Sequence, residues 1–172
     1  MSAPLVVALG SPHGDDRVGW EALERLSRSA DCPGHVRCVR LDSPAGLPVQ
    51  LPGAGPLILV DAVRSGAAPG TVQRLSWPED AERWPAAAAL SSHGMGLAQA
   101  LELAAALDLL PARVTVFAVE AASVTPGQPL SPAVAGALPA LIASLRAELT
   151  RALPETARNG PVAAAASPRT MR

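Results

Sequence analysis

The sequence predicts an α/β protein in which a twisted, mostly parallel sheet carries helices on both faces and so forms three layers. Three compact runs have the length and composition of buried strands, namely Leu5–Leu9, Leu57–Val60 and Arg113–Val119. Segments with helical periodicity separate these runs, and such alternation is typical of βαβ units. The length of 172 residues fits one domain with a substantial hydrophobic core.

The first part of the chain predicts a strand, a helix and a second strand. Leu5–Leu9 is apolar throughout and ends at a glycine, as expected of a strand buried on both faces. A helix is expected from about Asp16, because large apolar residues then recur on one helical face. These residues are Trp20, Leu23, Leu26 and Ala30. His35–Leu41 has polar residues at alternate positions, which favours a strand near the edge of the sheet.

The middle of the chain predicts two more strands. Leu57–Val60 is the second compact apolar run, and we expect this strand to stop at Asp61. Thr71–Leu75 alternates apolar and polar residues after a Pro-Gly turn, which predicts a further strand. Residues 76–90 are rich in Trp, Pro and Ala, and their pattern supports no assignment.

The last part predicts a helix, a strand and a long helix. Gly94–Leu110 has a strongly helical pattern and is followed by a proline that stops it. Arg113–Val119 is the third strong strand, and Ser131–Leu153 opens with proline in its first turn, where proline suits a helix. We expect one domain over residues 1–153. Residues 154–172 have no periodicity, so we expect a disordered tail.

The composition excludes several classes of protein. The formal net charge is -1, and no basic run is present, so a nucleic-acid partner is not expected. No uninterrupted stretch of about 18 apolar residues exists and no secretory signal is visible, so we expect a soluble, cytoplasmic protein without a membrane span. All 14 basic residues are arginines, and the absence of lysine excludes a Walker-type phosphate loop.

Polar side chains gather where the predicted elements meet the carboxyl end of the sheet. Asp15 and Asp16 follow the first strand, Asp61 ends the middle strand, and His93 precedes the long helix. Ligands of open α/β sheets bind just beyond the carboxyl ends of the strands. Two carboxylates and an imidazole brought together there would form a site for a transition metal with open positions.

Each of these residues also has a structural interpretation. Acidic residues are common in the first turn of a helix whatever its function, and a lone His93 near a helix start is more often structural. Asp61 is harder to explain, because a carboxylate at the end of an apolar strand is costly to bury unless it is paired, hydrogen bonded or metal-bound. Cys32, His35 and Cys38 form a weaker alternative, a zinc site without a spaced fourth ligand.

Four stretches of the chain carry a more specific pattern. They are Leu5–Gly19, with its strand, short loop and Asp-Asp pair; Leu59–Gly66 with Pro69–Thr71, which matches D-A-V…G…P-G-T; Ser92–Leu97 with Leu110–Val114; and Leu130–Val134. Together they span nearly all of residues 4–150, and they resemble the hydrogenase maturation endopeptidases, which trim the large subunit of nickel–iron hydrogenases.

Some positions depart from the pattern of that family. Ser11 stands where the family usually has Asn, and Arg17 replaces a common Gly. Asp42–Gly46 keeps only part of the family's D-G-G-T-x-G segment, and Glu120 lacks the proline that often follows it. These departures concern the geometry of the loops and the choice of partner more than the metal contacts.

The resemblance implies an α/β fold and assigns the metal contacts to Asp16, Asp61 and His93, with His13 as a further candidate ligand. It implies hydrolysis of one peptide bond near the C-terminus of a nickel-loaded hydrogenase large-subunit precursor. We expect no permanently bound cofactor, because nickel is supplied by the substrate, although a divalent metal can occupy the same site. One carboxylate that the metal does not fully occupy would act as general base.

The expected partner is therefore the large-subunit precursor, and the protein itself is expected to be a monomer. The alternative is a non-proteolytic α/β binding protein for a small metabolite or a metal, which the departures at Ser11, Arg17 and Ser43 favour. An aminopeptidase-like or nucleoside-processing enzyme is a weaker third interpretation, since a fold alone does not fix the chemistry.

Overall fold

The computed structural model describes residues 2–29, 35–83 and 96–152 of the chain. Its centre is a sheet of five strands in the order β2-β1-β3-β5-β4. The first four of these pair in parallel, and β4 runs antiparallel to β5 at one edge. The strands are β1 (Leu5–Leu9), β2 (Arg37–Leu41), β3 (Leu57–Val63), β4 (Val72–Trp77) and β5 (Val114–Glu120). The predicted mostly parallel sheet is confirmed.

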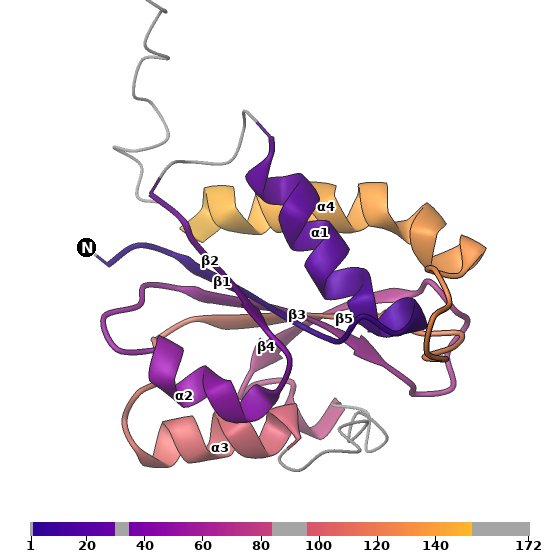
Figure 1. The fold of residues 1–172 in the computed structure, drawn as a ribbon. Coiled ribbons are helices and arrows are strands. Elements are labelled where there is room, and N and C mark those ends of the chain that lie inside the picture. The colour runs from indigo at the N-terminus through magenta and orange to yellow at the C-terminus, as the bar shows by residue number, and fades with distance from the viewer. Residues whose placement is uncertain (1, 30–34, 84–95, 153–172) are drawn as a thin grey trace, which may run out of the picture.

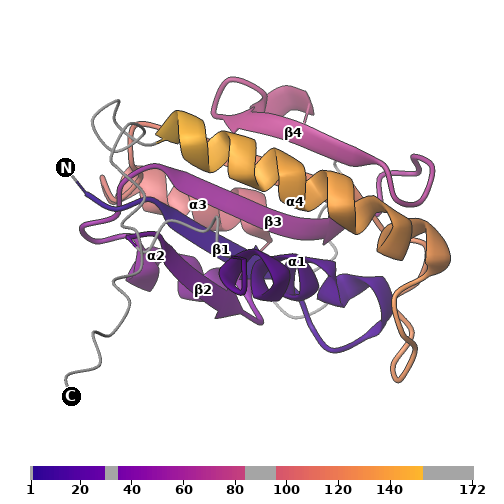
Figure 2. The ribbon, with the colours of Figure 1, turned by 90° about the horizontal axis from the view of Figure 1, so that it is seen from above.

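Helices cover both faces of this sheet. On one face lie α1 (Val18–Ser27) and α4 (Pro132–Ala152), and on the other lie α2 (Leu47–Gln50) and α3 (Leu97–Ala106), as Figures 1 and 2 show. Three short 3-10 helices complete the described elements: η1 (Gly14–Arg17), η2 (Pro44–Gly46) and η3 (Ala81–Arg83). The protein therefore has the predicted three-layer architecture.

The alternation of side chains along the strands explains why the strand sequences are continuously apolar. Successive residues of a strand point to opposite faces, and here both faces are covered. The side chains packed with α1 and α4 include Val6, Ala8, Ile58, Val60, Phe117 and Val119. Those packed with α2 and α3 include Leu5, Val7, Leu57, Leu59, Val114 and Val116. The central strands thus contribute to two separate apolar layers.

The structure differs from the sequence prediction at the end of β3, at the start of the first helix and in residues 44–50. The strand β3 continues through Asp61 to Val63 instead of stopping at Asp61, because its pairing with β5 persists to the end of that strand. The first helix begins as the 3-10 turn η1. Residues 44–50 form η2 and α2, which were not predicted because elements of three and four residues carry no measurable periodicity.

The end of α3 also comes earlier than predicted. The sequence pattern extends to Leu110, whereas the helix ends at Ala106. Asp108 takes a positive φ of 54°, and the amide of Leu109 donates to the carbonyl of Ala104 at 2.9 Å. A residue in the left-handed conformation is a common helix terminator, so the apolar residues after it pack on the core from outside the helix.

The helix α4 is long and apolar enough to cross a membrane when only length and composition are considered, with a mean hydropathy of 1.3 over 18 residues. Its position on the sheet accounts for this composition. One side of the helix is buried against the strands through Val134, Leu138, Leu141, Leu145 and Leu149. Such one-sided burial is typical of the core helix of a globular protein. The predicted tail lies outside the described residues and stays a prediction.

Candidate active site at the carboxyl end of the sheet

Two glycines allow the chain after β1 to lie directly on the strand ends. Gly10 follows β1 with a φ of 150°, and a Cβ on it would overlap the carbonyl oxygen of Asp16. A Cβ on Gly19 would lie 2.7 Å from the carbonyl oxygen of Leu9 and 3.0 Å from that of Val60. Both spacings are too short for a real side chain, so glycine brings η1 and the start of α1 against the ends of β1 and β3.

The two adjacent aspartates of η1 have different environments. Asp15 is fully buried, and its carboxylate accepts hydrogen bonds from the amides of Ala122 (2.7 Å), Ser123 (3.1 Å) and Ser131 (2.6 Å). Burial opposes ionisation, but these hydrogen bonds outweigh it and lower the pKa of Asp15. Asp16 is partly exposed. Asp15 therefore ties η1 to the segment before α4, and Asp16 is the aspartate accessible to a ligand.

Asp61 lies close enough to Asp16 for the two carboxyl groups to repel each other. Removal from water is the main cause that raises the pKa of Asp61 to about 8, and the negative charge of Asp16 is the second. The side chain is only partly exposed, although β3 is otherwise buried on both sides of it. By the alternation along β3, Asp61 has the same orientation as Leu59, toward the face covered by α3.

The predicted trio is described only in part. Asp16 and Asp61 are brought together, whereas His93 lies outside the described residues, four positions before α3 begins at Leu97. Within residues 2–29, 35–83 and 96–152, no group of three or more His, Cys, Asp or Glu side chains is placed to hold a metal ion. The assignment of all three residues to one site stays a prediction.

The other candidate ligands have simpler surroundings. His13 is exposed on the loop before η1, and its amide donates to the hydroxyl of Ser11 at 3.4 Å. Cys38 is exposed on β2. Cys32 lies outside the described residues, so the alternative zinc site stays untested as well.

Glu120 is a residue of this region that the sequence analysis did not count among the site residues. It is 3% exposed, and its carboxylate accepts hydrogen bonds from the amide and hydroxyl of Ser65 and from the amide of Gly66, at 2.6–3.0 Å. Burial acts against ionisation, but these bonds and the charge of Arg64 lower its pKa. Glu120 therefore fixes the loop after β3. A carboxylate ending an apolar strand was the available signal.

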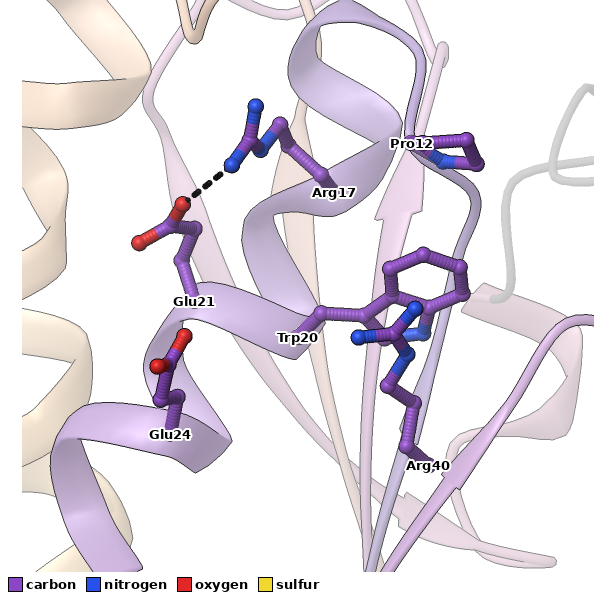
Figure 3. Close-up of a pocket in the computed structure, with 6 residues that line it drawn as sticks. All are labelled: Pro12, Arg17, Trp20, Glu21, Glu24 and Arg40. Atoms are coloured by element: carbon purple, nitrogen blue, oxygen red, sulfur yellow. Dashed lines mark hydrogen bonds and ion pairs between the residues drawn. The ribbon is translucent and has the colours of Figure 1, made fainter. Parts of the chain in front are cut away.

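A pocket of about 170 Å³ lies beside η1, between α1 and β2. Its lining residues are Pro12, Arg17, Trp20, Glu21, Glu24 and Arg40 (Figure 3). The indole Nε1 of Trp20 donates to the carbonyl of Leu41 at 3.1 Å, and the guanidinium of Arg40 stacks 3.4 Å from the centre of the indole ring. Sequence analysis placed Trp20 on the buried face of a helix, and it had no signal for its partner on β2.

The arrangement at the strand ends is suited to a cation. Asp15 and Glu120 are satisfied by backbone and hydroxyl donors, and their pKa values are lowered. Asp61 has its pKa raised, because the nearby charge is of the same sign and burial is not compensated. A divalent cation placed between Asp16 and Asp61 would remove this repulsion, and carboxylates are suitable ligands for it.

Comparison with known proteins supplies the context for this geometry. Residues 45–148 match a family model described as hydrogenase maturation protease. No curated protein sequence matches the chain. Among solved structures, the E. coli hydrogenase maturating endopeptidase HybD shares 25% identity over 87% of this chain and 93% of its own, with a TM-score of 0.74. The HybD protease from Thermococcus kodakarensis shares 24% identity over 86% and 99% of the two chains, with a TM-score of 0.69.

Proposed function

The chain belongs to the hydrogenase maturation protease family, and from that premise we propose that it removes the C-terminal extension of a nickel-loaded [NiFe]-hydrogenase large-subunit precursor. Family membership makes it an endopeptidase of hydrogenase maturation, and so decides against the non-proteolytic binding protein. The observation that carries the finer proposal is the pair of mutually repelling carboxyl groups, Asp16 and Asp61, at the carboxyl end of the sheet.

Nickel enters this site as part of the substrate. A cation held by the precursor relieves the repulsion between Asp16 and Asp61 when the two proteins associate, and Asp61 then gives up its proton. His93 is the third proposed contact, and a neutral imidazole is a common nickel ligand. Bound nickel would polarise the scissile carbonyl or acidify a water molecule. The metal is then the recognition signal, and a precursor without it associates poorly.

The general base of the proposed reaction is a carboxylate that nickel leaves free. It accepts a proton from the attacking water, and because Asp61 is assigned to the metal, its pKa of about 8 without the cation does not identify it as the base. The protein needs no permanent cofactor of its own in this scheme. We propose further that it acts as a monomer in the cytoplasm.

Cleavage of matched precursors tests the proposal. The purified protein is mixed with nickel-loaded precursor and with metal-free precursor, and release of the C-terminal peptide is followed by mass. We expect rapid release only from the loaded form. Equal cleavage of both forms would contradict recognition through nickel.

The role of His93 is tested in the same assay. His93→Ala should lower the rate of release by at least about 100-fold, the scale of a lost ligand or general acid–base group. His35→Ala is the matched control, because His35 is exposed and lies just before β2, away from η1 in the sequence. Full activity of a folded His93→Ala protein would remove that residue from the site.

A further inference from the structure

We propose that the pocket between α1 and β2 binds a carboxylate group of the precursor through Arg40, which Trp20 holds in place, and that it thereby contributes to the choice of substrate. This inference rests on the proposed proteolytic function, because it extends the substrate-binding surface away from the Asp16–Asp61 pair. It concerns residues that the reaction itself does not use.

The geometry of Arg40 favours an external anion. Its guanidinium lies over the Trp20 ring (Figure 3), 3.4 Å from the ring centre. Trp20 is in turn anchored by its hydrogen bond to the carbonyl of Leu41. No carboxylate within the described part of the chain forms an ion pair with Arg40. Stacking on an aromatic ring orients the planar fork of donors, and this fork matches a carboxylate.

The acidic residues of the pocket wall are already paired with other arginines. Glu21 accepts from Arg17 at 2.7 Å and lies 3.9 Å from Arg25, and Glu24 pairs with Arg28 at 2.6 Å. They are therefore poor competitors for Arg40. The pocket wall holds two arginines and two glutamates, and both glutamates are engaged by arginines other than Arg40.

The size and place of the pocket indicate one side chain or chain end of a peptide. A volume of about 170 Å³ is well below the roughly 300–1,000 Å³ of pockets for drug-sized ligands. Arg17 in the wall directly follows Asp16, and Pro12 belongs to the loop that leads into η1. A peptide whose metal-bearing part is held at Asp16 therefore passes this pocket with its neighbouring residues.

Binding of a carboxylate can be measured without any precursor. The chain has three Trp and no Tyr, so the full-length variant Trp77→Phe/Trp84→Phe has Trp20 as its fluorophore. We expect N-acetylglutamate to change the Trp20 emission in a saturable way, and N-acetylglutamine to have no such effect. Arg40→Gln should abolish the response. Arg37→Gln, which removes the same charge from another position of β2, should retain it. Equal responses to the acid and the amide, or a response that survives Arg40→Gln, would overturn the proposal.

Kinetics with the nickel-loaded precursor test the same pocket in the enzyme. Arg40→Gln should raise KM by about 3- to 10-fold with little change in kcat, as expected for an exposed charge-assisted contact. Arg40→Lys keeps the charge, so its KM should lie between those of the wild type and Arg40→Gln. Two substrate changes identify the source of the carboxylate: amidation of the C-terminus, and Glu→Gln or Asp→Asn near the scissile bond. One of them should raise KM for the wild type and have no effect on Arg40→Gln.

The outcomes separate the two proposals. If no precursor is cleaved but Trp20 still reports N-acetylglutamate through Arg40, the proposed protease activity fails and the anion pocket stands alone. If the precursor is cleaved with the same KM by Arg40→Gln and by wild type, the pocket has no part in substrate choice, and this inference is overturned while the proteolytic function stands.

Discussion

Asp61 and Glu148 are both shielded carboxyl groups, yet they lie at opposite ends of the sheet in opposite electrostatic environments. Asp61, at the carboxyl end of β3, faces another carboxyl group, and its pKa is raised to about 8. Glu148, on α4 near the amino end of β5, is 2% exposed. Arg74 donates to it twice, at 3.0 and 3.2 Å, and Thr115 once, at 3.0 Å.

Three arginines surround the carboxylate of Glu148. Arg151 and Arg113 lie 3.4 and 3.6 Å from its oxygens, in addition to Arg74. Burial opposes ionisation, but the bonds from Arg74 and Thr115 outweigh it, so the pKa of Glu148 is lowered. The comparison shows two electrostatic situations in one fold. Glu148 is fully paired, whereas Asp61, the proposed metal contact, keeps an uncompensated burial and a neighbouring charge of the same sign.

The largest expected effect is on activity, at the carboxyl end of the sheet, where Asp61 lies. Asp61→Asn should lower the cleavage rate of nickel-loaded precursor by at least about 100-fold, because a proposed metal contact is lost. The free energy of unfolding at pH 7 should rise, because wild-type Asp61 must take up a proton on folding at this pH and asparagine need not. Glu102→Gln on the exposed side of α3 is the control and should behave as wild type. A normal rate for Asp61→Asn would place Asp61 with the structural acids.

The next largest effect is on stability, at the opposite end of the sheet, where Glu148 lies. Glu148→Ala should lower the free energy of unfolding by about 2–3 kcal/mol, somewhat less than for a fully buried pair, because its arginine partners are 42–54% exposed. Urea titration measures the change. The cleavage rate per folded molecule should not change. A variant that unfolds normally but loses activity would mean that the two ends of the sheet are coupled.

A substitution of Gly19 tests whether the site at the carboxyl end of the sheet depends on close packing of α1 against the strand ends. Gly19→Ala places a Cβ 2.7 Å from the carbonyl oxygen of Leu9, so α1 must move away from the strand ends. We expect a loss of about 1–2 kcal/mol, in the range of overpacking effects, together with a lower cleavage rate. Gly136→Ala is the control, because its added Cβ meets nothing within 4 Å. Wild-type activity in Gly19→Ala would show that the position of η1 is not critical.

The last expected effect is a difference in pH dependence between the two acids. The pKa of Asp61 is about 8 in the folded state against 3.8 ordinarily, so the folded protein holds a proton that the unfolded chain has released. Stability therefore falls as the pH rises between about 4 and 8. Asp61→Asn should remove this trend, which is measured as the unfolding free energies of variant and wild type at pH 5 and 8. A constant difference between the two would contradict it.

Glu148 should show the opposite sign. Its pKa is lowered in the folded state from 4.5, so its contribution is complete above that value and is lost as the pH falls through the folded pKa. The difference in unfolding free energy between wild type and Glu148→Gln should accordingly be constant from pH 6 to 8 and shrink below about 4.5. A difference that persists at low pH would show that Glu148 acts by packing and not by charge.

Sequence patterns predicted the parts of this fold that depend on local apolar runs. β1, β2, β5 and α4 were predicted with bounds close to those found, because apolar strands covered on both faces leave a strong signal. The predicted end of β3 was wrong by three residues. A charged residue after an apolar run indicates the end of a strand, but the pairing of β3 with β5 continues beyond Asp61 to Val63.

The site was predictable only as a set of strand-end residues. Nothing local distinguishes Asp15 from Asp16. The distinction comes from three amides more than 100 positions away, which occupy Asp15 and leave Asp16 accessible. The stacking of Arg40 on Trp20 joins β2 to α1, and no sequence motif indicates this contact. Such long-range pairings depend on tertiary contacts, which periodicity and local spacing do not report.

The bonds to Asp15 also set when the site can exist during synthesis. They join the turn after β1 to Ala122, Ser123 and Ser131, between 107 and 116 positions later. A chain still emerging from the ribosome carries Asp16 and Asp61 long before the segment that fixes η1 has been made. The bonds that hold η1 at the strand ends therefore cannot form until β5 and the start of α4 have been synthesised.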